Sequence, residues 1–140
     1  MKQIPVIFWT ATGNTQMMAD AIAEAINAAG AEAVVKNVSE ITADEAAGYD
    51  ALAFGCPAMG AEVLEECEFE PFFTELEGKL AGKKVALFGS YGWGGSYMQD
   101  WEARVKDAGA TLVADGVLAL GAPDDEAMAK LAEAGKLLAE

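Results

Sequence analysis

Short apolar runs without polar side chains alternate along this chain with segments of helical periodicity. The runs Ile4 to Trp9, Ala51 to Gly55 and Val85 to Phe88 are the clearest. An unbroken apolar run of this length is typical of a strand buried on both faces of a parallel sheet. Two further strands are expected at Ala33 to Asn37 and at Thr111 to Leu120.

Apolar residues that recur every three or four positions predict helices between these strands. Gly30 and Gly109 stand where C-terminal helix caps belong, and a weak helix is expected from Thr42 to Ala47. The main helices have these apolar positions: Met18, Ile22 and Ile26; Phe69, Phe72, Phe73, Leu76 and Leu80; Met98, Trp101, Val105 and Ala108; and Met128, Leu131 and Leu138.

This alternation predicts an α/β fold of the doubly wound type, with residues 1–140 forming one domain. We expect a three-layer α/β/α sandwich around a five-stranded parallel sheet, with the common strand order 2-1-3-4-5. In such sheets, ligands bind at the carboxyl ends of the strands, beside the point where the strand order reverses. The loops after the first, third and fourth strands are therefore the candidate site.

The chain is strongly acidic. Nine Lys and Arg residues stand against 23 Asp and Glu residues, which gives a formal net charge of −14. This charge repels nucleic acid and anionic membranes and favours partners with basic docking surfaces, although a need for solubility would also explain it.

The cysteines and the first apolar run bear on location. Cys56 and Cys67 are the only cysteines and there is no histidine, so neither a disulfide framework nor a zinc site is expected. Ile4 to Trp9 is too short to span a bilayer and lacks the flanks of a secretory signal. We therefore expect reduced thiols, no membrane association and a cytoplasmic protein.

The loop after the first strand reads Thr10-Ala11-Thr12-Gly13-Asn14-Thr15, and a helix is expected to begin at once. Hydroxyls, an amide and a glycine at a helix N-terminus suit a phosphate, although an ordinary helix cap needs the same residue types. Neither a P-loop nor the G-x-G-x-x-G of dinucleotide-binding folds is present. All basic residues lie outside the three loops, so a phosphate here would have neutral donors.

The other two loops contain groups suited to a flat aromatic ligand. The third strand is followed by a turn containing Met59, a polarizable side chain that packs well against aromatic rings. The fourth strand is followed by Tyr91 and Trp93, which lie among several glycines. Glycine lets the backbone approach a ligand closely, and the aromatic rings can stack on it.

Together these three loops resemble those of the flavodoxins, in the same order and at the same topological positions. The resemblance covers essentially the whole chain. It is closest to the short-chain, clostridial type, because the last strand lacks the long insertion of the long-chain type. The motifs that carry it are Thr10-x-Thr12-Gly13-Asn14-Thr15, Met59-Gly60 with Glu62, and Gly89-Ser90-Tyr91-Gly92-Trp93-Gly94.

The resemblance implies a site for FMN. Its phosphate would be bound by Thr10, Thr12, Asn14 and Thr15, the backbone around Ala11 and Gly13, and Ser90. Met59 and Trp93 would cover the two faces of the isoalloxazine, with Tyr91 nearby, Glu62 accepting from the ring N3–H and the Gly60 carbonyl accepting from N5–H. Pro57 and Ala61 stand where relatives often have polar residues or glycine. The expected cofactor-binding set is completed by these two residues with Ala58, Gly92 and Gly94.

A flavodoxin is a one-electron carrier, and the resemblance therefore implies one that cycles FMN between semiquinone and hydroquinone. Net negative charge and a site without Lys or Arg disfavour the anionic hydroquinone, which predicts a low potential for the second electron. We expect a monomer whose redox partners, ferredoxin-type reductases and low-potential oxidoreductases, dock through basic surfaces. The expected docking acids are Glu62, Glu65, Glu66, Glu68 and Glu70, with Asp100 and Glu102, although a solvated helix start would also favour such acids.

Two other functions are compatible with this class of fold. An FMN-dependent NAD(P)H:quinone reductase needs substrate space above the flavin, and the short loops and the lack of histidine argue against it. A phosphoryl receiver needs acids after the first strand, an Asp after the third and a Lys after the fifth. These places hold Trp9-Thr10, Cys56-Pro57 and Leu120-Gly121, which excludes the receiver.

Overall fold

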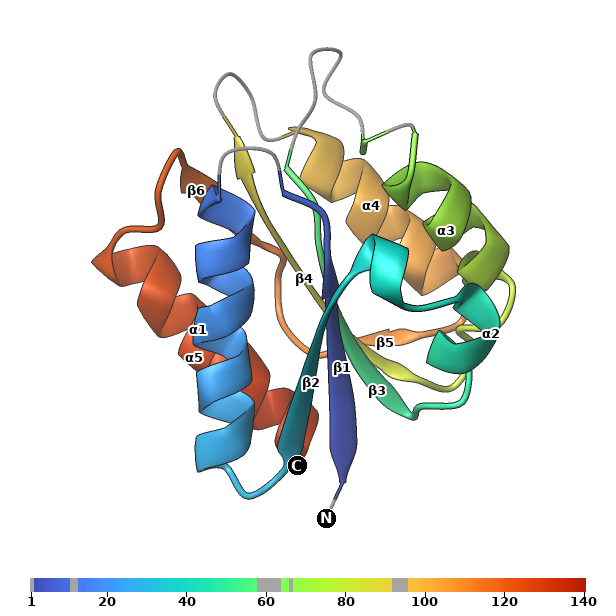
Figure 1. Cartoon of the computed structure of the whole chain (residues 1–140), viewed down its shortest axis with the longest axis horizontal. Helices are drawn as coiled ribbons and strands as arrows, with labels where there is room; N and C mark the ends of the chain where they lie inside the picture. The colour runs from blue at the N-terminus through green and yellow to red at the C-terminus, as the bar shows by residue number, and fades with distance from the viewer. Residues whose placement is uncertain (1, 11–12, 58–63, 66, 92–95) are drawn as a thin grey trace.

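All the apolar runs expected to form strands do so in the computed structural model, which describes residues 2–10, 13–57, 64–65, 67–91 and 96–140 (Figure 1). The paired strands are parallel, and the order β2-β1-β3-β4-β5 confirms the predicted doubly wound topology. The strands are β1 (Gln3–Phe8), β2 (Glu32–Asn37), β3 (Ala51–Gly55), β4 (Lys84–Tyr91), β5 (Thr111–Leu112) and β6 (Val117–Leu120).

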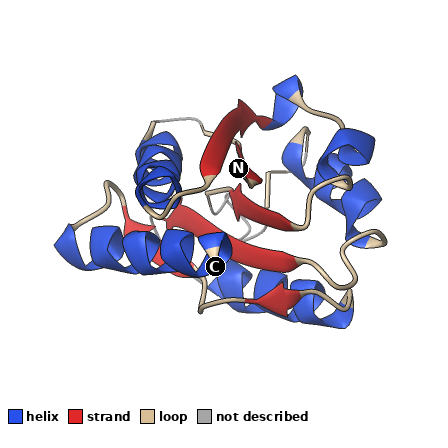
Figure 2. Ribbon diagram, turned by 90° about the horizontal axis from the view of Figure 1, so that it is seen from below, coloured by secondary structure: helices blue, strands red, loops and turns tan. Residues whose placement is uncertain are grey.

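Helices cover both faces of the sheet, which gives the predicted three layers (Figure 2). α1 and α5 pack on one face, and α2, α3 and α4 pack on the other. The expected weak helix is α2, which Thr42 caps, and Gly30 and Gly109 have the positive φ of helix-ending residues. The helices are α1 (Asn14–Ala28), the 3₁₀ turn η1 (Val38–Glu40), α2 (Ala43–Ala46), α3 (Phe69–Glu77), α4 (Ser96–Asp107) and α5 (Asp125–Ala139).

The two faces are packed with different residues. Beneath α3 and α4, aromatic rings meet edge to face, with centroids 5.4 Å apart for Phe54 and Phe73 and 5.7 Å apart for Phe73 and Trp101. Beneath α1 and α5 the core is mostly aliphatic. There Gly135 lets α5 approach α1, because a Cβ at Gly135 would lie 2.8 Å from the Ala25 Cβ.

The last strand differs from its prediction, because Thr111 to Leu120 forms two short segments instead of one. Both pair with β4, with Leu112 opposite Val85 and Val117 opposite Phe88. Residues 112 and 117 are five positions apart and residues 85 and 88 are three apart, so the outer strand carries two extra residues. An even number of extra residues keeps each side chain on its face, which explains why the apolar pattern did not reveal the break.

Candidate functional site

The first candidate segment lies at the N-terminus of α1, directly after β1. The N-cap residue Gly13 has a φ of 92°, which glycine adopts freely, and its N–H donates to Thr10 Oγ1 at 3.0 Å. No side chain in the described part of the chain caps this helix, and its first turn contains no acid. The backbone N–H groups and the positive end of the helix dipole are therefore placed to bind an anion.

Two hydroxyl groups from distant parts of the sequence meet beside this helix end. Thr15, in the first turn of α1, lies with its Oγ1 3.2 Å from Oγ of Ser90, near the end of β4. Both residues are buried, with exposures of 1% and 6%. Only one hydroxyl can donate within the pair, so the hydrogen of the other is available to another acceptor. The structure thus brings residues of the first and third predicted loops together. Asn14 directly precedes Thr15 in the sequence.

The third candidate loop leaves the sheet at Tyr91, the last residue of β4. The Tyr91 side chain is half-buried and packs against the apolar cluster beneath α3 and α4. Its carbonyl accepts from the N–H of Gly121 at 3.0 Å, which ties it to the loop after β6. Leu120, opposite Tyr91 in the sheet, is 67% exposed and adds apolar surface to this edge.

The second candidate loop begins at Pro57, and its base is closed by contacts that the sequence analysis missed. The thiol of Cys56 accepts from the N–H of Glu65 at 3.3 Å, so residues on either side of segment 57–64 are joined. The carbonyl of Cys56 accepts from the Tyr97 hydroxyl at 2.8 Å. A Cβ at Gly89 would lie 2.1 Å from that hydroxyl, which explains why glycine occupies this position.

The remaining expected site residues lie outside the described residues. They are Ala11, Thr12, Ala58, Met59, Gly60, Ala61, Glu62, Gly92, Trp93 and Gly94.

Three of the acids expected to dock a partner bind groups of the fold itself. The Glu65 carboxylate is buried and accepts from the backbone N–H groups of Cys67, Glu68 and Phe69 at 2.7, 2.7 and 2.9 Å. Burial opposes its ionisation, but these bonds outweigh burial and hold the pKa of Glu65 below its usual value. The burial of such an acid cannot be predicted from the sequence, because the same residue types occur as helix-capping carboxylates and as solvated ones.

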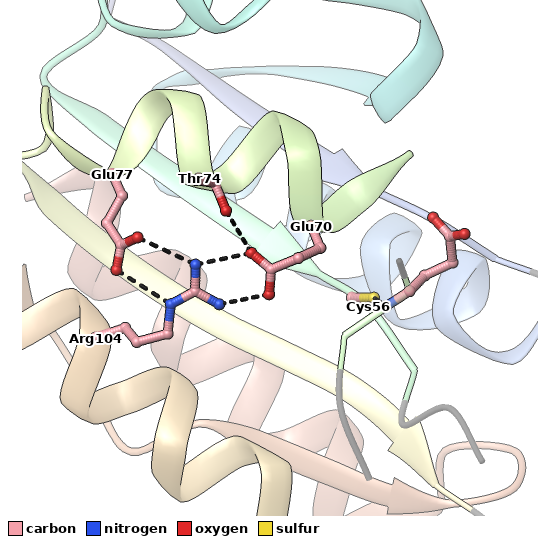
Figure 3. Close-up of polar contacts among 6 residues, drawn as sticks. Cys56, Glu70, Thr74, Glu77 and Arg104 are labelled. Carbon is pink, nitrogen blue, oxygen red and sulfur yellow. Dashed lines mark hydrogen bonds and ion pairs between the residues drawn. The ribbon is translucent and has the colours of Figure 1, made fainter. Parts of the chain in front are cut away.

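Glu70 is the second such acid, and it pairs with Arg104 across α3 and α4 (Figure 3). Both of its oxygens accept from the guanidinium, at 2.7 and 2.9 Å, and Glu77 binds the same guanidinium at 3.1 Å. The hydrogen bond from Arg104 lowers the pKa of Glu70.

Glu102 is the third such acid, because its half-buried carboxylate accepts from the N–H of Gly116 at 2.7 Å. Glu68 and Asp100 are exposed, and the Glu68 carboxylate accepts from Trp9 Nε1 at 3.3 Å.

The described residues form neither a metal site nor a membrane-spanning helix, and their buried thiol is not reactive. Among those residues, no three His, Cys, Asp or Glu side chains converge as metal ligands would, and no helix there is long and apolar enough to cross a membrane. Burial raises the pKa of the Cys56 thiol to about 12, so it stays protonated and unreactive at neutral pH. The donor set is therefore neutral hydroxyls and backbone N–H groups, which fits a phosphate held without cations.

Comparison with known proteins identifies the family of the chain. The sequence model of the flavodoxin family matches residues 6–135 of the chain. The chain belongs to the flavodoxin family. It is 47% identical over 135 residues to the flavodoxin of Clostridium beijerinckii, which covers 96% of this chain and 97% of that one. A flavodoxin is an FMN-binding electron carrier, and FMN is the cofactor of this chain.

Solved structures support the same family. The solution structure of two-electron reduced Megasphaera elsdenii flavodoxin superposes with a TM-score of 0.89 and 42% identity, covering 97% of this chain and 98% of that one. A longer relative is the anaerobic nitric oxide reductase flavorubredoxin of Vibrio vulnificus. It is 30% identical over 145 residues, which cover 99% of this chain but 29% of that protein. The family therefore includes flavodoxin-like segments of enzymes as well as free carriers.

Proposed function

We propose that residues 1–140 act as one FMN-binding domain that shuttles single electrons between redox proteins at low potential and is not itself an enzyme. The main observation behind this proposal is that the hydroxyls of Thr15 and Ser90 lie in contact beside the N-terminus of α1, which no described side chain caps. It supports a phosphate site at the edge where parallel sheets of this topology bind ligands.

In this proposal the first loop binds the FMN phosphate. Thr10, Thr12, Asn14 and Thr15 would donate through their side chains, Ala11 and Gly13 through the backbone, and Ser90 would complete the set. The absence of Lys and Arg from the loops leaves the phosphate charge uncompensated by cations, so binding relies on the helix dipole and neutral donors.

The isoalloxazine would lie between the second and third loops. The second loop contributes Pro57, Ala58, Met59, Gly60, Ala61 and Glu62, and the third contributes Tyr91, Gly92, Trp93 and Gly94. FMN supplies the redox chemistry when it is bound. The chain would exclude water from the ring and surround it with negative charge, which disfavours a second negative charge on the flavin and lowers the second potential.

An enzymatic role is the alternative, namely an NAD(P)H:quinone reductase of the same fold. The match over almost the full length of a free flavodoxin favours the carrier. Turnover of NAD(P)H with a quinone by the isolated protein would support the reductase. We expect no turnover above the rate of free FMN.

Charge distribution supports partners with basic docking surfaces. Near the carboxyl edge, Glu68, which precedes α3, and Asp124, the N-cap residue of α5, are exposed acids. At the amino edge, Lys83 and Lys84 offset part of the charge. The electrostatic field of the protein therefore favours a basic partner that approaches the cofactor edge. We also propose that the carrier is a monomer. Its two free thiols, Cys56 and Cys67, fit a reducing compartment, which supports the cytoplasm.

The experiment that tests the proposal combines binding with reduction. We expect the apoprotein to bind one FMN per chain and riboflavin much more weakly, because riboflavin lacks the phosphate. Photoreduction followed by absorbance should then show two separated one-electron steps. Equal affinity for riboflavin and FMN would contradict the phosphate site, and a single two-electron step would contradict the one-electron carrier.

A further inference from the structure

Cys56 occupies the point where four parts of the fold meet, directly after β3. Its N–H donates to the carbonyl of Phe88 on β4 at 3.1 Å, and its carbonyl accepts from the hydroxyl of Tyr97 on α4 at 2.8 Å. Its thiol accepts from the N–H of Glu65, just before α3, at 3.3 Å. Each polar group of Cys56 thus binds a different element, and the residue is fully buried.

Glu65 extends this arrangement into α3. Its carboxylate binds three backbone N–H groups ahead of and within the first turn of the helix, and its carbonyl accepts from the N–H of Glu70 at 2.8 Å. The position of Glu65 is therefore fixed by α3, and the position of Cys56 by the sheet. The thiol contact joins these two fixed points across segment 57–64.

We infer that Cys56, Glu65 and Tyr97 form a clasp that positions segment 57–64 for FMN. This inference rests on the proposed function, which assigns residues 57–62 of that segment to the flavin. Cys56 and Glu65 flank the segment, so a shift of either one displaces an end of it. The clasp residues are positioning residues, because they act through the segment that they flank.

The thiol of Cys56 fixes the position of Glu65 because it is the acceptor for the buried N–H of that residue. Without an acceptor at Cys56, this N–H would be left unpaired in a buried place, and Glu65 would have to move to regain a partner. A serine hydroxyl at position 56 could still accept the bond, whereas an alanine could not. Comparing Cys56→Ser with Cys56→Ala therefore distinguishes the loss of a hydrogen-bond acceptor from the loss of side-chain volume.

Flavin affinity of the full-length apoprotein, measured by fluorescence quenching with riboflavin and with FMN, tests the clasp. We expect Cys56→Ala to weaken the binding of both flavins about tenfold, since the loss of one buried hydrogen bond is of this order. Both should weaken by the same factor, because the phosphate loop is untouched. Cys56→Ser should stay within about threefold of the wild type.

Cys67→Ser is the matched control, because Cys67 is exposed and serine keeps both its backbone N–H bond to Glu65 and a side-chain donor beside that carboxylate. It should stay within about twofold of the wild type for both flavins. Tyr97→Phe removes the other contact to Cys56, should weaken both flavins by about threefold to tenfold, and serves as the test if Cys56→Ala does not fold.

Wild-type affinity in Cys56→Ala, or a Cys56→Ser variant as weak as Cys56→Ala, would overturn the clasp alone. Weaker FMN binding with unchanged riboflavin binding would also overturn it, because the effect would then lie in the phosphate loop. A wild-type chain that binds no flavin would overturn the proposed function together with the clasp.

Discussion

At the amino edge of the sheet, lysine side chains donate to backbone carbonyls, whereas at the carboxyl edge two neutral hydroxyl groups meet beside a helix N-terminus. Lys83 Nζ donates to the carbonyl of Tyr49 at 2.8 Å, and Lys2 Nζ donates to the carbonyl of Leu138 at 3.3 Å. At the opposite edge, the Thr15 and Ser90 hydroxyls meet beside a helix end that no described side chain caps. The two lysines stabilise the fold, whereas the two hydroxyls leave a donor for a ligand.

Two glycines, one near each edge, differ in how closely the chain packs around them. Gly89, near the carboxyl end of β4, lies against Tyr97 and the backbone of Cys56. Gly78, at the C-terminus of α3, has no heavy atom of the described chain within 4 Å of the place its Cβ would take. Glycine is thus required for close backbone packing at position 89 but not at position 78.

Gly89→Ala should have the largest effect on stability. Its Cβ would lie 2.2 Å from the Cys56 carbonyl oxygen, which is backbone and cannot move aside without shifting β3. We expect a loss of about 3 kcal/mol in the free energy of unfolding of the apoprotein, measured with urea. Gly78→Ala is the control, and with a φ of −71° it should gain about 0.5 kcal/mol. Equal effects of the two substitutions would abolish the contrast between the two positions.

Thr15→Val should have the next largest effect, on FMN binding. Valine keeps the shape of threonine but removes a hydroxyl that the proposal assigns to the phosphate. A hydrogen bond to a charged group contributes about 2 kcal/mol, so we expect the Kd for FMN to rise roughly 30-fold and the Kd for riboflavin to stay unchanged. Thr111→Val, at the exposed start of β5, should leave both constants unchanged. A parallel loss of riboflavin affinity would place the effect of Thr15 outside phosphate binding.

Arg104→Met tests a charge cluster that stabilises the fold without serving the cofactor. Methionine retains an apolar stem over the Phe73 ring but loses the contacts with Glu70 and Glu77. We expect a loss of about 1 to 2 kcal/mol in unfolding free energy at neutral pH, with the Kd for FMN unchanged. A change in FMN affinity as large as that of Thr15→Val would show that the cluster is coupled to the site.

The same variant has a predicted pH dependence. Because the folded-state pKa of Glu70 is lowered, its pairing with Arg104 stabilises the fold above the ordinary carboxyl pKa of 4.5. This stabilisation is lost as the pH falls through the lowered pKa of the folded state. The difference in unfolding free energy between the wild type and Arg104→Met should therefore shrink below pH 4.5. A difference that stayed constant down to pH 2 would exclude Glu70 as its source.

Most of the fold could be predicted from the sequence, because buried parallel strands and amphipathic helices have distinct apolar periods. The strand order followed from the common arrangement of five-stranded doubly wound sheets. The break between β5 and β6 could not be predicted, since two added residues leave the alternation of faces intact. Gly116 lies between the two segments, where a Cβ would lie 2.4 Å from Met98 Sδ.

The candidate site was predictable where its residues are consecutive and less so where distant residues meet. The helix N-terminus after Thr10 was predicted from a local pattern of hydroxyls and glycine. The pairing of Thr15 with Ser90 depends on tertiary structure, although the topology already placed their loops at one edge. The role of Cys56 was not predicted, because a buried thiol that accepts a hydrogen bond has no characteristic sequence pattern. Glu65 was misassigned to docking because charge alone does not reveal burial.

The smallest expected effect concerns charge at the two edges, compared through a matched pair of substitutions. Glu68 lies at the carboxyl edge and accepts from Trp9 Nε1, and Glu32 lies at the amino edge and accepts from the Gln3 amide. Glutamine at either position keeps an acceptor and removes one negative charge. The two variants therefore differ only in which edge loses charge.

If a basic redox partner docks at the carboxyl edge, Glu68→Gln should slow its association by about 1.5- to 2-fold at low salt, while Glu32→Gln should change it less. Exposed charges are screened over about 10 Å at 0.1 M salt, so the difference should fade as salt rises past that concentration. Stopped-flow reduction of a basic acceptor protein across a salt series measures both effects. Equal slowing by the two variants would mean that net charge alone steers the partner, and a larger effect of Glu32→Gln would place docking at the opposite edge.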